Sequence, residues 1–336
     1  MSLPLPNTIE EAQKSPNWDV PGGYKEATEK ECGSWVRHEV LQNAASVPDG
    51  LNLVNLRTLF SVKTDKKNRF KRAKLRVVVL CHKHVAERGQ HFFENFSQTV
   101  RWPNLRALCA QACLEGFSVA EQWDTSTAFL YEKLEPGARV IVRVPPELQS
   151  YFGVGEFAWV MKAAYGVPGA PRGFYKFAKK LLTNPETCKC ICSRQDEAVF
   201  VRRQGSKYVF IAIWVDDFMV LSNDRALCDS VREAYFGTVD GETGPLDCML
   251  GVNFYVSVEH QTIKLTSEAT IDSIVQRFGT PVRSASTPAL ESSADLMHEP
   301  LPESGSPLQA KVASASVVAR SLAPGSTPLV PVVVVV

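Results

Sequence analysis

The strongest constraint on the fold is an apolar run that ends in two adjacent aspartates. Residues 208–215 are continuously apolar and rich in β-branched and aromatic side chains, and residues 218–221 resume the pattern. Two such segments separated by two residues predict a β-hairpin with Asp216 and Asp217 as its connection. Connections of this length favour Asn-Gly or Asp-Gly, because both positions require positive φ. Two like charges there indicate a functional site, with a solvated acidic turn as the alternative.

A third acid ends an upstream segment. Residues 117–123 alternate like a half-buried strand, and Asp124 follows at the carboxyl end. Mg²⁺ is typically held by one or two carboxylates together with substrate phosphates. Two such ions roughly 3.5–4 Å apart stabilise the attacking and leaving oxygens of in-line phosphoryl transfer. One acid on a strand end and two on a neighbouring hairpin therefore indicate a nucleotide polymerase.

Four segments resemble, in order and spacing, the reverse transcriptase of copia-type LTR retrotransposons. They are residues 122–130 (QWDTSTAFL), 164–175 (AYGVPGAPRGFY), 214–217 (WVDD) and 249–252 (MLGV). Weaker similarity on both sides extends the resemblance over about residues 6–288. An ordered set of four motifs is far more specific than any one of them.

The resemblance implies an α+β fold of the right-hand polymerase type. Such a fold has fingers, a palm whose antiparallel sheet is backed by helices, and here a partial thumb. Local signals agree with this class. They predict helices over residues 105–114, from Pro171, after Asn223, and from Thr266 or Ser267 to Phe278.

The chain divides at residue 288. Residues 1–288 form the predicted reverse transcriptase domain, with fingers and palm over about 6–288. Residues 289–336 are dominated by Ser, Pro and Ala and end in five valines, a composition that predicts disorder. The family normally continues into an RNase H domain, which so short a low-complexity tail cannot form.

The resemblance also assigns roles to individual residues. It makes Asp124, Asp216 and Asp217 catalytic, and with the backbone carbonyl of Thr125 they would hold two Mg²⁺ ions, for which Mn²⁺ can substitute. Nucleotide binding is assigned to Arg72, Lys74, Thr127, Ala128, Phe129, Tyr165 and Gly166, and primer binding to Leu250 and Gly251. Phe129 matches an aromatic position that excludes a 2′-hydroxyl, with core packing as the alternative role. The implied partners are an RNA template, a DNA primer or RNA–DNA hybrid, and dNTPs.

The charge distribution is uneven along the chain. A net charge of +1 is low for a nucleic-acid-binding protein judged as a whole. Between Lys63 and Arg76, however, eight basic residues are opposed by Asp65 alone. Such a run is either a phosphate-binding patch or a solvated hairpin face.

Cysteine usage indicates a reducing compartment. The chain has nine cysteines and no N-terminal signal peptide, so we expect a cytoplasmic protein, within a virus-like particle, or a nuclear one. Cys188, Cys190 and Cys192 are spaced too closely for a zinc knuckle, and no His or Cys pair stands nearby. No apolar stretch reaches the roughly 18 residues of a membrane span.

Two departures from the family pattern bear on activity. Trp214 stands where the family usually has tyrosine, and Pro168-Gly169 replaces a more polar pair.

The prediction from the sequence is an RNA-directed DNA polymerase that transfers nucleotides from a dNTP to a primer 3′-hydroxyl. Two alternatives stay open: a catalytically inactive retrotransposon remnant that retains the fold and nucleic-acid binding, and a metal-dependent phosphodiesterase.

Overall fold

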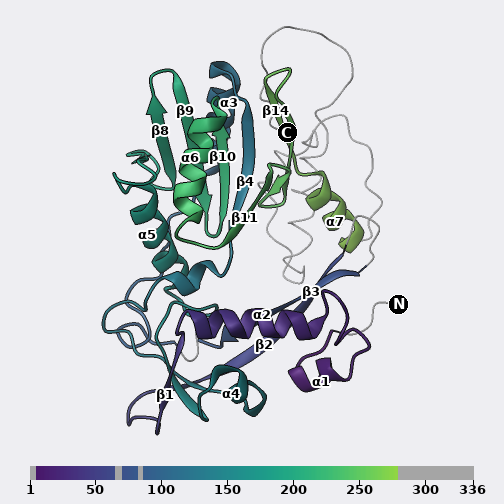
Figure 1. Ribbon diagram of the computed structural model, residues 1–336, viewed down its shortest axis with the longest axis vertical. Coiled ribbons are helices and arrows are strands. Elements are labelled where there is room, and N and C mark those ends of the chain that lie inside the picture. The colour runs from purple at the N-terminus through teal and green to yellow at the C-terminus, as the bar shows by residue number, and fades with distance from the viewer. Residues whose placement is uncertain (1–4, 65–69, 82–85, 279–336) are drawn as a thin grey trace, which may run out of the picture.

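A computed structural model describes residues 5–64, 70–81 and 86–278. The largest sheet is antiparallel throughout and is backed by helices (Figure 1). Its strand order is β11 (Gly241–Pro245), β4 (Val119–Thr125), β10 (Asp217–Ser222), β9 (Lys207–Trp214), β8 (Val199–Gln204) and β7 (Ile191–Cys192). This arrangement confirms the predicted α+β class.

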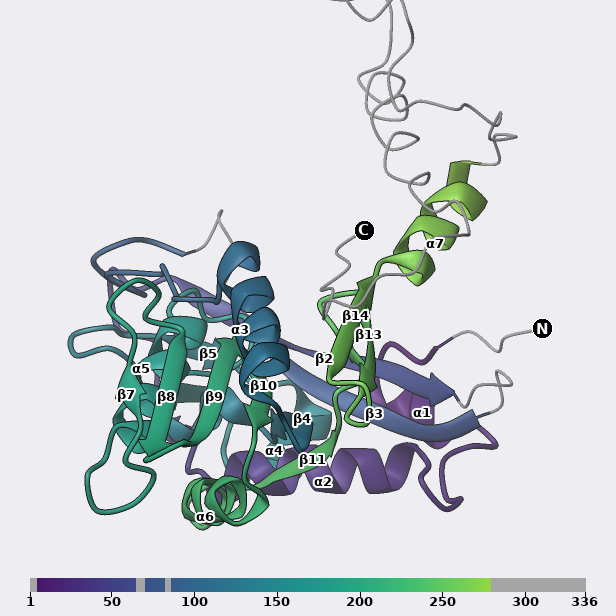
Figure 2. The same cartoon turned by 90° about the horizontal axis from the view of Figure 1, so that it is seen from above.

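Helices cover both faces of this sheet. Figure 2 shows α3 (Trp102–Glu115) and α6 (Arg225–Phe236) on opposite sides of it. Successive side chains of β10 point to opposite faces of the sheet, so this strand can pack against helices on both sides. Phe218 lies 6.4 Å from the ring of Phe174 on α5 (Ala170–Leu182) and 5.2 Å from that of Tyr235 on α6. The next residue, Met219, faces Cys109 on α3.

The predicted helix boundaries are close to the observed ones. Pro171 lies in the first turn of α5, where a backbone N–H would have no partner within the helix, so its missing N–H costs no hydrogen bond. Asp224 caps α6, since its side chain accepts a hydrogen bond from the Leu227 backbone N–H at 2.7 Å. Helix α3 starts at Trp102, earlier than predicted, and ends before Gly116, whose φ is 80°.

A second sheet mixes parallel and antiparallel pairs. Its order is β1 (Leu41–Ala44), β6 (Phe157–Val160), β5 (Ile141–Arg143), β2 (Leu53–Thr64) and β3 (Phe70–Val79), with β2 and β5 parallel. Three helices belong to the same part of the chain as this sheet: α1 (Ile9–Gln13), α2 (Tyr24–Arg37) and α4 (Pro146–Phe152). Helix α2 packs along β3, and its Trp35 stacks on Phe152 of α4 with 5.4 Å between ring centroids.

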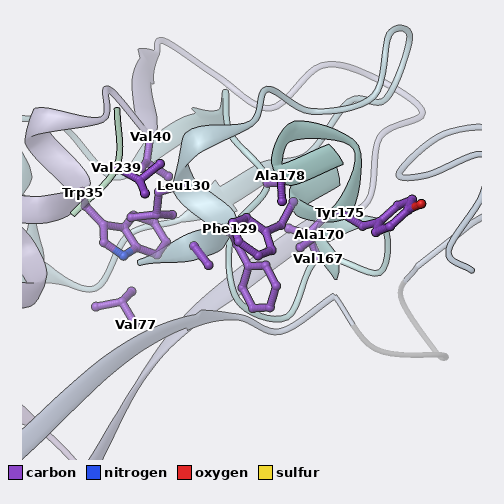
Figure 3. Packing of buried hydrophobic residues seen from close by; sticks show 14 of the residues in the cluster. Trp35, Val40, Val77, Phe129, Leu130, Val167, Ala170, Tyr175, Ala178 and Val239 are labelled. Atoms are coloured by element: carbon purple, nitrogen blue, oxygen red, sulfur yellow. The ribbon is translucent and has the colours of Figure 1, made fainter. Parts of the chain in front are cut away.

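A continuous core joins the two large sheets. One buried cluster includes Trp35 and Val77 from the mixed sheet and its helix together with Leu130 and Val239 from around the antiparallel sheet (Figure 3). The 3₁₀ turn η1 (Ala128–Tyr131), which directly follows β4, inserts three buried residues into this cluster. Burying each large apolar side chain stabilises a fold by about 1.5–3 kcal/mol, so the two sheets hold each other in place.

A small third sheet carries the last helix. Its order is β12 (Cys248–Met249), β13 (Val252–Ser257) and β14 (Thr262–Thr266), followed by α7 (Glu268–Phe278). Figure 2 shows α7 extending away from the other elements, and its Ile274 and Val275 are each 39% exposed. The predicted tail, residues 289–336, lies outside the described residues, so the boundary at 288 stays a prediction.

Candidate active site

The hairpin differs from the prediction at its tip. Asp217 pairs with Trp214 and begins β10, so the two-residue connection is Val215–Asp216 rather than Asp216–Asp217. Val215 has φ 57°, a left-handed conformation that is a genuine outlier for a β-branched residue. The prediction was wrong because an apolar side chain was taken to continue the strand. Backbone strain of this kind costs of order 1–3 kcal/mol and clusters at functional sites.

Three carboxylates form a row across three strands. Asp124 is part of β4 rather than following it, and it lies opposite Asp217 on β10 and opposite Glu242 on β11. Directly opposed residues of antiparallel strands share one face of the sheet. Asp216 adjoins this row, since its backbone carbonyl accepts a hydrogen bond from the Thr125 N–H at 3.3 Å.

The neighbouring acids affect the pKa of Asp217. Burial raises the pKa of Asp217, and the charges of Asp216 and Asp124 raise it further. A hydrogen bond from Gln122 Nε2 to Asp217 Oδ1, 3.0 Å long, opposes that increase. Carboxylates held together in this way are stabilised by a cation between them, and oxygen ligands suit Mg²⁺ or Mn²⁺. Within the described residues, however, no three His, Cys, Asp or Glu side chains are arranged to hold a metal ion.

A cavity of about 510 Å³ lies between the antiparallel sheet and β3. Asp124 and Asp216 contribute to its lining, and β3 contributes Arg72, Lys74 and Arg76. These three cations are two residues apart, so alternation along the strand places them on one side. A pocket that joins carboxylates to several cations suits a polyphosphate accompanied by divalent ions.

Two exposed ion pairs cross the cavity. Arg72 Nη1 lies 4.0 Å from Glu242 Oε1, and Arg37 Nη1 lies 3.9 Å from Asp240 Oδ2. All four residues line the cavity. Solvent-exposed pairs of this kind contribute only about 0–1 kcal/mol, so a charged ligand can displace them readily.

Tyr165 connects β3 to the acids. Its ring lies 5.4 Å below the guanidinium carbon of Arg76 and meets the edge of Phe129 at 4.8 Å between centroids. Burial, with a further contribution from the charge of Asp216, raises the pKa of its phenol to about 12. Tyr165 is therefore a neutral aromatic side chain in the cavity wall at physiological pH.

Comparison with known proteins identifies the family. The family described as reverse transcriptase (RNA-dependent DNA polymerase) matches residues 41–291. This chain belongs to the reverse transcriptase family. In the fold that the motifs predict, the antiparallel sheet with its acids corresponds to the palm and the mixed sheet with β3 to the fingers.

Two plant retrotransposon proteins resemble this reverse transcriptase. The retrovirus-related Pol polyprotein from transposon RE2 of Arabidopsis thaliana is 24% identical over 229 residues, which cover 68% of this chain and 15% of the relative. The corresponding RE1 polyprotein is 24% identical over 222 residues, covering 66% and 14%. The chain therefore spans about one seventh of the length of these relatives.

Similarity to solved structures is more distant. The foamy viral protease-reverse transcriptase, solved in complex with double-stranded DNA, aligns with 76% of this chain and 37% of its own length. The TM-score is 0.44 and the sequence identity 13%. Among the described helices of this reverse transcriptase, none has the length and apolar character needed to cross a membrane.

The predicted nucleotide-binding residues divide into two groups. Thr127 lines the cavity of the reverse transcriptase along with Tyr165 and the β3 cations. Ala128 and Phe129 are instead buried in the core, where Phe129 is 7% exposed and packs against Phe174 as well as Tyr165. The packing role of Phe129 is therefore supported, whereas its selection against ribose stays a prediction.

Glycine positions explain two further motifs. Gly166 has φ 90°, and a Cβ there would lie 2.0 Å from the carbonyl oxygen of Val79, so only glycine allows this approach to β3. Leu250 and Gly251, with φ 58° and 74°, form the two-residue turn between β12 and β13. Both positive values are typical of a hairpin turn. Neither residue lines the cavity of the reverse transcriptase.

Several site residues were not predicted from sequence. Gln122 carries a weak signal, because it precedes Asp124 by two residues and so shares its face of the strand. Asp240 and Glu242 reach the site only through the pairing of β11 with β4. Glu31 does so through the packing of α2 on β3. In the predicted basic patch, Lys66, Lys67 and Arg69 lie outside the described residues.

Proposed function

We propose that this chain is the RNA-directed DNA polymerase of a copia-type retrotransposon, which adds dNTPs to a primer 3′-hydroxyl. The observation that carries the proposal is the cavity that unites Asp124 and Asp216 of the palm with Arg72, Lys74 and Arg76 of the fingers. The four ordered motifs support the copia type. An RNA template, a DNA primer or RNA–DNA hybrid, and dNTPs are the proposed partners, in the cytoplasm or the nucleus.

Carboxylate oxygens are the ligand type that suits the divalent ions that the family implies. Asp124, Asp216 and Asp217, with the backbone carbonyl of Thr125, would hold two Mg²⁺ or Mn²⁺ ions. When bound, such ions lower the pKa of the primer hydroxyl and neutralise charge on the departing pyrophosphate. Gln122 orients Asp217 through its hydrogen bond, and the pairing of β4 with β10 fixes the spacing of the two strands.

The remaining cavity residues would bind and orient the nucleotide. Arg72, Lys74 and Arg76 oppose the negative charge of the triphosphate, and arginine can do so with two parallel hydrogen bonds. Tyr165 offers an aromatic surface against the base or sugar. The turn at Leu250 and Gly251 would contact the primer strand. These roles follow from residue type and place, and each is open to substitution.

Two departures from the family pattern keep the alternative of an inactive remnant open. They are Trp214 and Pro168-Gly169. A remnant would bind nucleic acid without extending a primer.

Primer extension on poly(rA) with an oligo(dT) primer distinguishes the two functions. The wild-type chain should incorporate dTTP with Mg²⁺ or Mn²⁺. Asp216→Asn should lower turnover by several orders of magnitude, because it weakens a site where charge stabilisation supplies most of the catalysis. Asp49→Asn, an exposed aspartate outside the cavity, is the matched control. Wild-type activity in Asp216→Asn would contradict the proposal, and an inactive wild-type chain would favour the remnant.

A further inference from the structure

Glu31 on α2 is a buried carboxylate to which the proposed mechanism gives no role. It is 8% exposed and lines the same cavity as Asp124 and Asp216. Its Oε1 accepts two hydrogen bonds, from Trp35 Nε1 at 3.2 Å and from the backbone N–H of Val77 at 3.0 Å. Buried carboxylates are rarely kept without a specific partner, so these two bonds define what Glu31 does.

The second bond holds the edge of the fingers sheet. Strand β3 is last in the order of that sheet among the described strands, so its outward N–H groups need partners elsewhere. Ala73 donates to the carbonyl of Gly22 at 2.7 Å, and Val79 donates to that of Tyr165 at 2.8 Å. Val77 donates to Glu31. Of these three acceptors, only the carboxylate of Glu31 is a side chain, so a substitution can remove it selectively.

The part of β3 around Val77, which Glu31 holds by its hydrogen bond, also contacts Tyr165. Arg76 directly precedes Val77, and its guanidinium lies over the Tyr165 ring. Tyr165 also supplies the carbonyl that accepts from Val79. The bond from Glu31 therefore fixes β3 at the point between its two contacts with Tyr165.

The same carboxylate oxygen of Glu31 is also tied to the buried core. Trp35 is almost fully buried, and Figure 3 shows it within the cluster that includes Val40, Val77 and Val239. Its indole N–H donates to the same oxygen as Val77. Through these two hydrogen bonds, Glu31 fixes the edge of β3 relative to helix α2.

We propose that Glu31 is a positioning residue for nucleotide binding. It keeps the edge of β3 where Arg76 covers Tyr165 and where the β3 cations face the cavity. The inference rests on the proposed function, because the nucleotide is the ligand concerned. Since Glu31 acts through an acceptor oxygen on the fingers, it affects nucleotide affinity and leaves the palm acids unchanged.

Two substitutions separate the oxygen from the charge. Glu31→Gln keeps side-chain length and an acceptor oxygen but removes the charge, whereas Glu31→Asp keeps the charge and withdraws the oxygen by one methylene. Steady-state primer extension should give a KM for dTTP within about twofold of wild type for Glu31→Gln. Glu31→Asp should raise KM about tenfold with kcat unchanged, because withdrawing Oε1 leaves the buried N–H of Val77 without its acceptor. Glu29→Asp, exposed on the same helix, is the control.

Each other outcome overturns the inference. A raised KM in Glu31→Gln with a normal Glu31→Asp would show that charge matters instead, and equal KM values or a loss confined to kcat would remove the positioning role. Should Glu31→Asp fail to fold in a thermal melt, Glu31→Met takes its place, because it keeps length and burial without the oxygen. Dialysis of the full chain against dTTP separates the two proposals. If the wild-type chain neither binds dTTP nor extends a primer, both the polymerase function and the role of Glu31 are overturned. If the wild-type chain extends primers and Glu31→Asp has an unchanged KM, only the role of Glu31 is overturned.

Discussion

Asp217 lies directly opposite Asp124 across the pairing of β10 with β4. Like charges in that relationship destabilise a sheet. Burial and the neighbouring charges raise the pKa of Asp217 above its ordinary value. The folded chain therefore binds more protons than the unfolded chain between the unfolded and folded pKa values, and its stability falls as pH rises through that window.

Asp217→Asn should therefore stabilise the protein while abolishing primer extension. We expect a melting temperature about 1–3 °C higher at neutral pH, because one of the opposed charges is gone. The difference should shrink as the pH falls below the ordinary aspartate pKa of about 3.9, where Asp217, whose pKa is raised, is protonated and no longer charged. Differential scanning calorimetry over a pH series measures this, with Asp49→Asn as the control. A lower melting temperature at neutral pH would contradict the strained acid row.

Gly166→Ala should destabilise the chain more than another substitution at positive φ. Its new Cβ would meet the Val79 carbonyl oxygen at 2.0 Å, whereas Gly153, with φ 66°, has nothing within 4 Å of that position. Gly153→Ala should lose only the roughly 1–2 kcal/mol of a left-handed residue. Urea unfolding of both variants gives the difference, which measures the clash with β3. Equal losses would mean that β3 moves away easily.

Phe129→Ala should lose about 3–5 kcal/mol of unfolding free energy, because the ring is buried against Tyr165 and Phe174. If Phe129 also lies under the incoming sugar, the variant should accept ribonucleotides more readily. The ratio of kcat/KM for dTTP and UTP tests this. Phe174→Ala is the matched control, since it removes a buried ring of the same cluster. The same sugar ratio in both variants would assign Phe129 to packing alone.

A chain shortened to end at Ala289 should fold and extend primers normally. The removed segment is rich in Ser, Pro and Ala and ends in a valine run of high β propensity without charge. We expect an unchanged melting temperature and higher solubility, measured by calorimetry and by light scattering. A melting temperature lower by several degrees, or lost activity, would place the domain boundary beyond residue 288.

Local signals explain what the sequence predicts correctly. Pro171 and the apolar spacing after it identify α5, and α6 begins soon after Asn223 as predicted. The acids lie at or beside the ends of strands, as the apolar segments before them indicate, and their catalytic role stays a prediction. Val215 was misplaced because side-chain type cannot reveal that the tip of the hairpin takes the residue into positive φ.

Residues that depend on distant pairing could not be predicted. Glu242 faces Asp124 only because β11 adds to the edge of β4. Glu31 becomes an acceptor for Val77, 46 residues later, only when α2 packs on β3. Neither position has a local pattern that distinguishes it from an ordinary surface glutamate. The cavity itself follows from the approach of two sheets, which no single segment encodes.

The place of β4 in the antiparallel sheet has a consequence for how the chain is synthesised. Both strands that flank β4 come later in the chain, and Gln122 meets its partner Asp217 across 95 residues. A ribosome therefore releases β4, with the large apolar surface of Trp123, long before either neighbour exists. Contacts of such high sequence separation form late and leave nascent chains prone to aggregation. A product interrupted before β10 would carry Asp124 without Asp217, so the carboxylate that β4 exposes would have no opposing strand to shield it.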